Sequence, residues 1–375
     1  MQFSQVPGYT EVKKALINAA QTGSTAHAML FAGAEGTPAL QLALAEAAYL
    51  NCTDRTDTDS CGICPGCSKT SKLVHPDLHL AFPTATNKTV TEKPVSEKFL
   101  PQFRNFVKEF PYGNAQDWAA FFGAENKQLN ISVEESRNII RGLSMKAFES
   151  EYKVMLLWLP ELMNLQAANA LLKMLEEPSA KTIFLLVSND INRLMATIIS
   201  RTQIFTLPPY TNNEMVALMR ARGADEKNAA RIARLSEGNV REALRLEADE
   251  GADSFPLFTR WMRTCFSRRF AELGELSDEF TKLGREGQKT MLHYTSTMIR
   301  EALIWRMGVP ELVRLPEEEA VFIEKFSPFV SMHNADDLYS LLNDAIFHIE
   351  RNASARILFF DLSLKIGASL NSRAA

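Results

Sequence analysis

The sequence predicts an α/β fold with a mostly parallel, doubly wound sheet, followed by regions that are helical throughout. Three observations predict it. Short apolar strands alternate with amphipathic helices up to residue 207, Pro208 and Pro209 interrupt this alternation, and the later segments have helical patterns. With 375 residues and 46% hydrophobic content, the chain has enough material for two or three packed domains.

The alternation starts with an amphipathic helix over 7–22 and a short apolar strand over 27–31. Ser132 and Glu135 form a capping box that predicts a helix start at 132. The remaining expected elements are helices over 38–51, 132–145, 165–177 and 191–199 and strands over 153–159, 182–188 and 203–207. Residues 211–250 read as a small helical bundle and 251–375 as a longer helical domain.

Residues 84–130 do not follow this alternation. The segment is polar and rich in Lys and Thr at first and then aromatic, with Phe99, Phe103, Phe106, Phe110, Tyr112, Trp118, Phe121 and Phe122. Such a density of aromatic side chains argues against disorder throughout. We interpret the segment as an inserted, partly helical subdomain whose role the sequence does not indicate.

Charge and hydropathy exclude several classes of protein. The 41 basic and 45 acidic residues give a net charge of −4, which argues against indiscriminate nucleic-acid binding. The N-terminal residues lack the pattern of a secretory signal, and the longest apolar runs are too short to span a membrane. We therefore expect a cytoplasmic protein whose cysteines are reduced or metal-bound.

Four of the five cysteines form a cluster with the spacing C-x8-C-x2-C-x2-C, at Cys52, Cys61, Cys64 and Cys67. Two-residue gaps let successive thiolates converge on one tetrahedral Zn²⁺. Disulfides suit the cytosol poorly, and no other redox signature supports an iron–sulfur cluster. We predict a structural zinc, since four thiolates leave no open position for catalysis. Cys265, alone in a helical pattern, is predicted to be a core residue.

A segment at 33–40 follows a strand and opens a helix, as a phosphate-binding loop would. A working loop needs backbone N–H donors, a lysine for the phosphates and a hydroxyl for Mg²⁺. Pro38 removes one N–H donor, Ala39 stands where the lysine would be, and Leu40 stands where the hydroxyl would be. The sequence therefore predicts no bound ATP and no hydrolysis.

The strand that would end in acidic Mg²⁺ ligands ends instead in Leu159 and Pro160. Glu161 is acidic, but a shift of one residue at a strand end turns a side chain to the other face. We assign no catalytic role to Glu161.

From residue 27 to about 245 the chain resembles bacterial DNA polymerase III clamp-loader subunits of the AAA+ superfamily. The motifs that carry the resemblance occur in the family's order: 27–31, the altered phosphate loop, the cysteine cluster, His75-Pro-Asp77, Asn169-Ala-Leu-Leu-Lys-Met-Leu-Glu-Glu-Pro178, Ser200-Arg-Thr202 and Gly238-Asn-Val-Arg-Glu-Ala-Leu244. Gamma/tau subunits keep the phosphate loop and the acidic pair. The losses described above make the chain similar to the delta-prime class.

The resemblance implies a domain plan. Residues 1–208 would form a degenerate AAA+ domain with a zinc module at 52–67 and an insertion at about 84–130. Residues 209–250 would form a small helical lid domain, and 251–375 a helical collar domain through which loader subunits assemble into a ring.

The resemblance also implies a function and partners. The chain would be a non-catalytic subunit that helps load the sliding clamp onto primed DNA, with gamma/tau and delta subunits, the clamp and primed-template DNA as partners. One alternative is an ATP-hydrolysing gamma/tau-type subunit, which Ala39, Leu40 and Leu159 argue against. The other is a free-standing zinc protein that binds nucleic acid, which the low net basicity argues against.

Arg201 is the candidate functional side chain. From the residues alone, a lone arginine between a helix and a strand is most often solvated or ion-paired. The family's Ser-Arg-Cys motif, here Ser200-Arg201-Thr202, implies an arginine finger supplied in trans to ATP on a neighbouring gamma subunit. The effect of threonine in place of cysteine is not indicated.

Other charged residues have more ordinary interpretations. Arg241 occupies the family's second sensor position, and without a phosphate loop we favour a packing ion pair over a relic. Lys173, Glu176 and Glu177 are expected on a solvated or interface face of their helix. Two interpretations stay open for Arg137, Arg141 and Lys146: contact with template phosphates, or a place on the solvent-exposed face of their helix.

Overall fold

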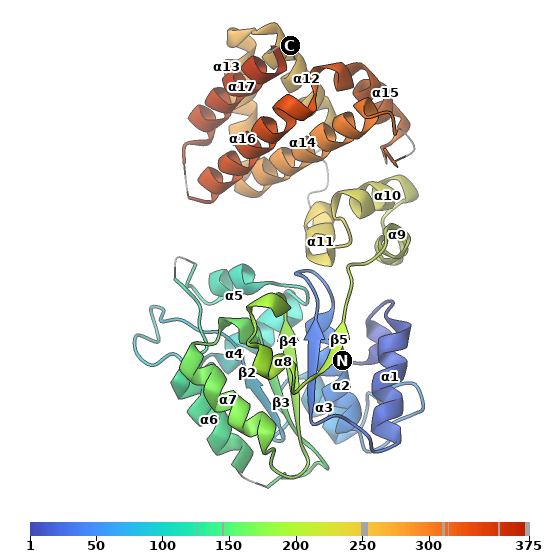
Figure 1. Ribbon diagram of the computed structural model, residues 1–375, viewed down its shortest axis with the longest axis vertical. Helices are drawn as coiled ribbons and strands as arrows, with labels where there is room; N and C mark the ends of the chain where they lie inside the picture. Colours follow the sequence, from blue (N-terminus) through green and yellow to red (C-terminus); the bar gives the residue numbers. More distant parts are fainter. Residues whose placement is uncertain are drawn as a thin grey trace. The chain divides into compact units, whose positions relative to one another are not determined.

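The computed structural model describes residues 1–125, 127–144, 146–248, 254–309, 312–313, 315–351 and 353–371. Two compact units can be distinguished (Figure 1). The first comprises Met1–Gly223 together with Glu237–Glu242, and the second comprises Ala224–Ser236 together with Ala243–Ala375. The predicted boundary at 250/251 lies outside the described residues, and the three-domain plan stays a prediction.

The first unit is built on a five-stranded sheet in which all neighbouring strands run parallel. Its strands are β1 (Ala28–Ala32), β2 (Leu78–Ala81), β3 (Lys153–Trp158), β4 (Thr182–Ser188) and β5 (Gln203–Thr206). Their order is β2-β3-β4-β1-β5, so β1 lies between β4 and β5. The predicted α/β fold with a parallel sheet is confirmed. Strand β2 was not predicted, because four residues at a sheet edge leave almost no periodic signal.

Helices flank both faces of this sheet (Figure 1). They are α1 (Thr10–Gln21), α2 (Ala39–Leu50), α3 (Pro65–Ser71), α4 (Ser96–Glu109), α5 (Ala115–Phe121), α6 (Val133–Ser144), α7 (Leu165–Glu176) and α8 (Ala196–Ile199). Helix α9 (Asn212–Ala221) also belongs to the first unit. The predicted end of α6 at Met145 lies outside the described residues. The single helix predicted over 191–199 is wrong. A short 3-10 helix, η3 (Ile191–Arg193), is separated from α8 by extended backbone at Leu194 and Met195.

Two hydrophobic cores lie against opposite faces of the sheet. Successive side chains of a strand point to opposite faces. In β3, Val154, Leu156 and Trp158 join one core, whereas Met155 and Leu157 join the other. Helices α1, α2, α4 and α5 contribute to the first core, and α6, α7 and α8 to the second.

The aromatic segment predicted as an inserted subdomain contributes helices α4 and α5 to the first core. The rings of Phe82 and Phe103 stack with their centroids 3.9 Å apart. The Trp118 indole packs edge-on against both rings, and its N–H donates to the Pro83 carbonyl at 2.8 Å. Phe103 and Trp118 are thus core residues that anchor the segment beside β2 and β3, whereas Phe110 is exposed.

Helix α2 is buried along its whole length and carries a carboxyl group into the core. Neither carboxylate oxygen of Glu46 has a hydrogen-bond partner among the described residues. Burial raises the pKa of Glu46 to about 8, although the charge of Arg55 opposes the shift. Glu46 is therefore protonated in the folded protein at neutral pH and ionised in the unfolded chain.

This difference predicts a pH-dependent effect of Glu46→Gln. The folded state holds the proton between about pH 4.5 and pH 8, so Glu46 makes unfolding easier as pH rises through that window. From pH 5 to pH 8 we expect the variant to gain about 2–4 kcal/mol relative to wild type. Urea unfolding at both pH values measures this gain, with the exposed Glu177→Gln as control. A difference between Glu46→Gln and wild type that stays constant with pH would contradict the prediction.

The second unit is helical in all its described elements. They are α10 (Glu226–Leu235), α12 (Ser254–Ser267), α13 (Phe270–Lys282), α14 (Gly284–Arg306), α15 (Glu317–Phe326), α16 (Met332–Glu350), α17 (Ala355–Asn371) and the 3-10 helix η5 (Ser327–Phe329), with α11 (Val240–Ala248) starting in the first unit. Among the described residues, no helix is both long and apolar enough to cross a membrane. The predicted helical C-terminal region is confirmed.

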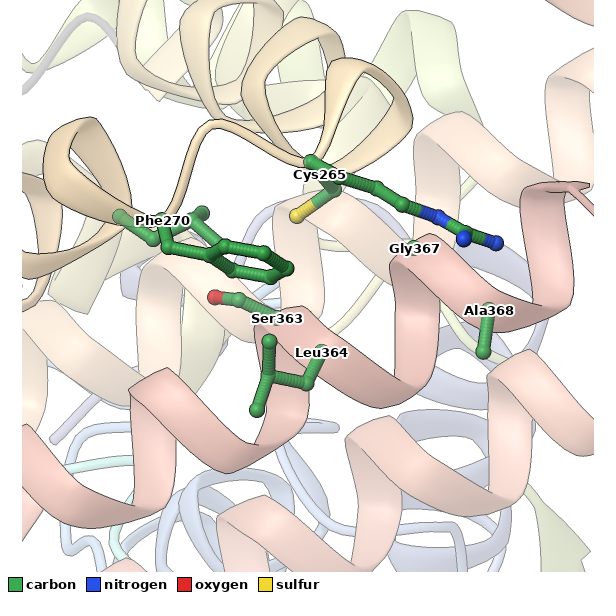
Figure 2. Close-up of a pocket in the computed structure, with 8 residues that line it drawn as sticks. Cys265, Phe270, Ser363, Leu364, Gly367 and Ala368 are labelled. Atoms are coloured by element: carbon green, nitrogen blue, oxygen red, sulfur yellow. The ribbon is translucent and has the colours of Figure 1, made fainter.

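Cys265 belongs to the core of the second unit. Its side chain is buried, and burial raises the pKa of the thiol to about 12. Cys265 lines a pocket with a volume of about 260 Å³. Figure 2 shows it there with Phe270, Ser363 and Gly367. The neighbouring Trp261 indole donates to the Ser363 hydroxyl at 2.8 Å. As predicted, Cys265 is a packed core residue.

Candidate functional site

The four clustered cysteines converge in space. The sulfur atoms of Cys52, Cys61, Cys64 and Cys67 all lie within 4.8 Å of one another. The Sγ–Sγ distances of the Cys61–Cys67 and Cys52–Cys64 pairs are both 3.9 Å. A tetrahedral zinc with Zn–S bonds of about 2.3 Å requires sulfur atoms about 3.8 Å apart. The donor set therefore fits a metal ion such as zinc.

Backbone groups of this loop support thiolate ligands. The N–H groups of Cys61, Cys64 and Cys67 donate to the sulfur atoms of Cys52, Cys61 and Cys64 at 3.3–3.4 Å. Burial opposes ionisation of Cys64, but N–H donors from Cys67 and Thr53 outweigh it and lower the pKa of Cys64 to about 6. A Cβ at Gly66 would lie 2.5 Å from the Asn51 carbonyl oxygen, so only glycine fits the turn.

The cysteine loop is tied to the rest of the first unit by charged side chains. Asp59 accepts the backbone N–H groups of Phe3 and Ser4, each at 2.9 Å. Lys69, on α3, forms an ion pair with Glu149 at 2.6 Å. A metal bound by the four cysteines would therefore stabilise contacts beyond its own loop.

The motif His75-Pro-Asp77 has a structural role in this arrangement. The Asp77 carboxylate accepts the backbone N–H groups of Phe148, Glu149 and Ser150 at 2.6–2.9 Å. Burial opposes ionisation, but these donors hold the pKa of Asp77 below its usual value. Asp77 thus holds residues 148–150 in place, and Glu149 of this loop pairs with Lys69.

The segment predicted to be an altered phosphate loop runs from Gly33 into α2. Thr37 donates its hydroxyl to the Ala34 carbonyl at 2.7 Å, which closes the loop on itself. Ala39 and Leu40 are 2% and 6% exposed and belong to the first hydrophobic core. Both side chains are directed into apolar packing.

The end of β3 is also apolar. Leu159 is buried with a φ of 58°, and Pro160 starts the short 3-10 helix η2 (Pro160–Leu162). The Glu161 carboxylate accepts the Asn189 N–H at 2.9 Å, which links this turn to the end of β4. Burial raises the pKa of Glu161.

Arg201 follows α8 and forms an ion pair inside the chain. Its Nη2 lies 2.6 Å from Oε1 of Glu176, and its Nη1 donates to the Thr197 carbonyl at 2.9 Å. The side chain is 35% exposed, so the guanidinium lies at the surface. The Thr202 hydroxyl donates to the Ile199 carbonyl at 3.0 Å and closes the turn that carries Arg201.

Arg241 forms the packing ion pair that the sequence favoured. Its guanidinium meets the carboxylate of Asp117, at the start of α5, through two hydrogen bonds of 2.5 and 2.6 Å. No sequence signal pointed to Asp117, which lies 124 positions away from Arg241.

A comparison with protein families assigns the chain to one of them. Residues 8–211 match the family described as DNA polymerase III, delta subunit, which is more than half of the chain. The chain belongs to this family. The resemblance to clamp-loader subunits is confirmed.

Individual relatives span two classes of subunit. The chain is 24% identical to DNA polymerase III subunit delta' of Escherichia coli over 94% of its own length and 92% of the relative. It is 27% identical to subunit delta' of Bacillus subtilis, covering 65% of this chain and 60% of that one. It is 25% identical to subunit gamma of Buchnera aphidicola, covering 65% of this chain and 57% of that one. In the last two cases the chain thus spans less than two thirds of the relative.

Most candidate residues lie within the family match. The match includes the cysteine cluster, residues 33–40 and Arg201, whereas Arg241 lies beyond it. Lys173, Glu176 and Glu177 are exposed on or next to α7, and Glu176 pairs with Arg201. Arg137, Arg141 and Lys146 are exposed as well, and Arg137 pairs with Glu134 at 3.0 Å. Contact of these three with DNA stays a prediction.

Proposed function

We propose that the chain is a non-catalytic, delta-prime-type subunit of a cytoplasmic DNA polymerase III clamp loader that helps load the sliding clamp onto primed DNA. Its partners are gamma/tau and delta subunits, the clamp and primed-template DNA. The observation that carries the proposal is the burial of Ala39 and Leu40, where a phosphate-binding lysine and a Mg²⁺-binding hydroxyl would be required.

Several features near this position oppose ATP chemistry. Pro38 offers no N–H donor to a phosphate. Glu35 adds a negative charge to the loop, and Leu159 provides no carboxylate for Mg²⁺ at the end of β3. Since phosphoryl transfer relies on positioning and on neutralising charge, these residues leave it unsupported.

The four cysteines would hold one structural zinc ion. When bound, the ion supplies four metal–sulfur bonds that fix the turns of residues 52–67. The side chains of Asp59 and Lys69 then transmit this order to the N-terminus and to Glu149.

Arg201 is the residue through which the chain would act on a neighbour. A guanidinium at the surface can be offered across a subunit interface, where its rigid fork matches the oxygen atoms of a transferring phosphoryl group. Glu176 orients this guanidinium in the isolated chain. When the chain joins a neighbouring subunit, the Arg201 guanidinium would leave the Glu176 carboxylate and bind phosphate oxygens of the nucleotide on that neighbour.

The alternative is an ATP-hydrolysing gamma/tau-type subunit, which is supported by the similarity to a gamma subunit over 250 residues. That alternative needs an intact phosphate site in this chain. The two candidates therefore differ in where the nucleotide binds.

The assembly experiment tests the proposal. Mixed with gamma/tau and delta subunits, the purified chain is expected to co-elute with them in size-exclusion chromatography. The assembly should hydrolyse ATP faster with clamp and primed DNA than the same mixture without the chain. An assembly that forms and turns over ATP equally well without this chain would contradict the proposal.

A further inference from the structure

The start of helix α11 lies directly on the altered phosphate loop. The Val240 N–H donates to the Gly36 carbonyl at 3.0 Å. A Cβ at Gly36, whose φ is +79°, would lie 1.8 Å from Oδ1 of Asn239. Residues 237–242 belong to the first unit, so the chain itself covers its loop.

A bidentate ion pair also holds the same segment, through Arg241, to helix α5. Arg241 donates through Nε and Nη2 to the two carboxylate oxygens of Asp117. Their side chains are only 29% and 22% exposed. Partly buried, two-point pairs of this kind are stronger than single contacts between exposed charges.

Asp117 is itself held in place by Asn114, which in turn contacts the altered phosphate loop. Asn114 caps α5 by accepting the N–H groups of Gln116 and Asp117, and its own N–H donates to Asp117 at 3.0 Å. The Asn114 side-chain amide donates to Glu35 of the loop at 2.8 Å. Helix α5, the loop and the start of α11 thus form one hydrogen-bonded network.

Tyrosines secure the chain that leads to this network. The Tyr210 hydroxyl donates to the Pro7 carbonyl at 2.9 Å, and its ring meets the Tyr9 ring edge-on at 5.1 Å. The Tyr210 N–H donates to the Gly238 carbonyl at 3.2 Å. A Cβ at Gly238 would lie 2.3 Å from the Tyr210 carbonyl oxygen, so this approach requires glycine.

We propose that segment 84–130 supplies a latch, namely the ion pair between Asp117 and Arg241. This latch keeps residues 237–242 against residues 33–37 of the altered phosphate loop when no nucleotide is bound. A carboxylate offers Arg241 the same two-oxygen face as a phosphate. In the latch, the Asp117 carboxylate therefore takes the place that the phosphate of a bound nucleotide would otherwise occupy. It rests on contacts within the first unit and stands independently of the proposed function.

Hydrogen exchange of the full chain tests the latch. Arg241→Gln removes the cation but leaves Asp117 and the α5 cap in place. Amides of residues 237–242 are expected to exchange about tenfold faster or more, as loss of a charge-assisted pair would produce, whereas β1 and β4 stay unchanged. Arg137→Gln, which breaks an exposed ion pair on α6, should change nothing in this segment. Unchanged exchange at 237–242 in Arg241→Gln would overturn the proposal.

A double-variant cycle separates the latch from local fraying of α5. Asp117→Asn should accelerate exchange to the same extent as Arg241→Gln, and the double variant should add nothing further. Additive effects would contradict a direct pair. Millimolar Mg²⁺-ATP should leave wild-type exchange at 237–242 unchanged, and slower exchange with ATP would show that nucleotide, not Asp117, holds the segment.

Discussion

Replacing Arg201 with alanine is expected to leave this chain folded, metal-loaded and able to join its partners, but to disable the assembly. Arginine fingers contribute about 10³–10⁵ in rate to phosphoryl transfer, so hydrolysis at the neighbouring site should fall by about 10³-fold. Loading of the clamp should fall at least about tenfold. Steady-state ATPase and clamp-loading assays on the reconstituted complex measure both effects.

Three further variants show whether the guanidinium itself is responsible. Arg201→Lys should rescue little, because an ammonium cannot reproduce the two-point fork. Arg193→Ala removes a nearby exposed arginine and should keep wild-type rates. Glu176→Gln removes the intramolecular partner of Arg201 and should leave the finger active. Wild-type rates for Arg201→Ala would contradict the proposed finger and show that Arg201 only forms a surface ion pair with Glu176.

Removing the metal from the cysteine cluster is the second change with a large expected effect. Cys64→Ser should lower the zinc content from one equivalent to well below one. It should also lower the Tm of the first unit by about 5 °C or more, since bound metal contributes directly to folding. Metal analysis and thermal unfolding of the full chain measure this, and prolonged chelation of wild type should have the same effect.

A matched cysteine outside the cluster provides the control. Cys265→Ala alters the core of the second unit and should keep the full zinc content. A wild-type preparation that never saw a chelator and yet contains far less than one equivalent of zinc would contradict the structural-zinc proposal.

The sequence predicted the parts of this fold that carry strong local patterns. The apolar runs of β1, β3 and β4 are buried on both faces, and the predicted bounds agree within a residue. The cysteine spacing predicted a cluster that the fold brings together. In both cases neighbouring residues specify the result, so no distant contact has to be known.

Contacts between distant segments were not predictable in this way. The capping box placed Ser132 correctly, since its hydroxyl accepts the Glu135 N–H at 3.3 Å. The Glu135 carboxylate, however, accepts the Ser96 N–H at 2.6 Å, and burial raises its pKa to about 7. The partnership of Asp117 with Arg241 likewise depends on how α5 packs. Sequence periodicity carries no information on such pairings.

Nucleotide binding by the isolated chain tests the central claim most directly. Titration of the zinc-loaded protein with Mg²⁺-ATP in a calorimeter, followed by a turnover assay, measures whether a phosphate site exists. The account predicts no saturable binding up to millimolar ATP and no hydrolysis above background, because Ala39 and Leu40 are buried in apolar packing. Micromolar binding with Mg²⁺-dependent turnover by the clean protein would contradict it and favour the gamma/tau-type alternative.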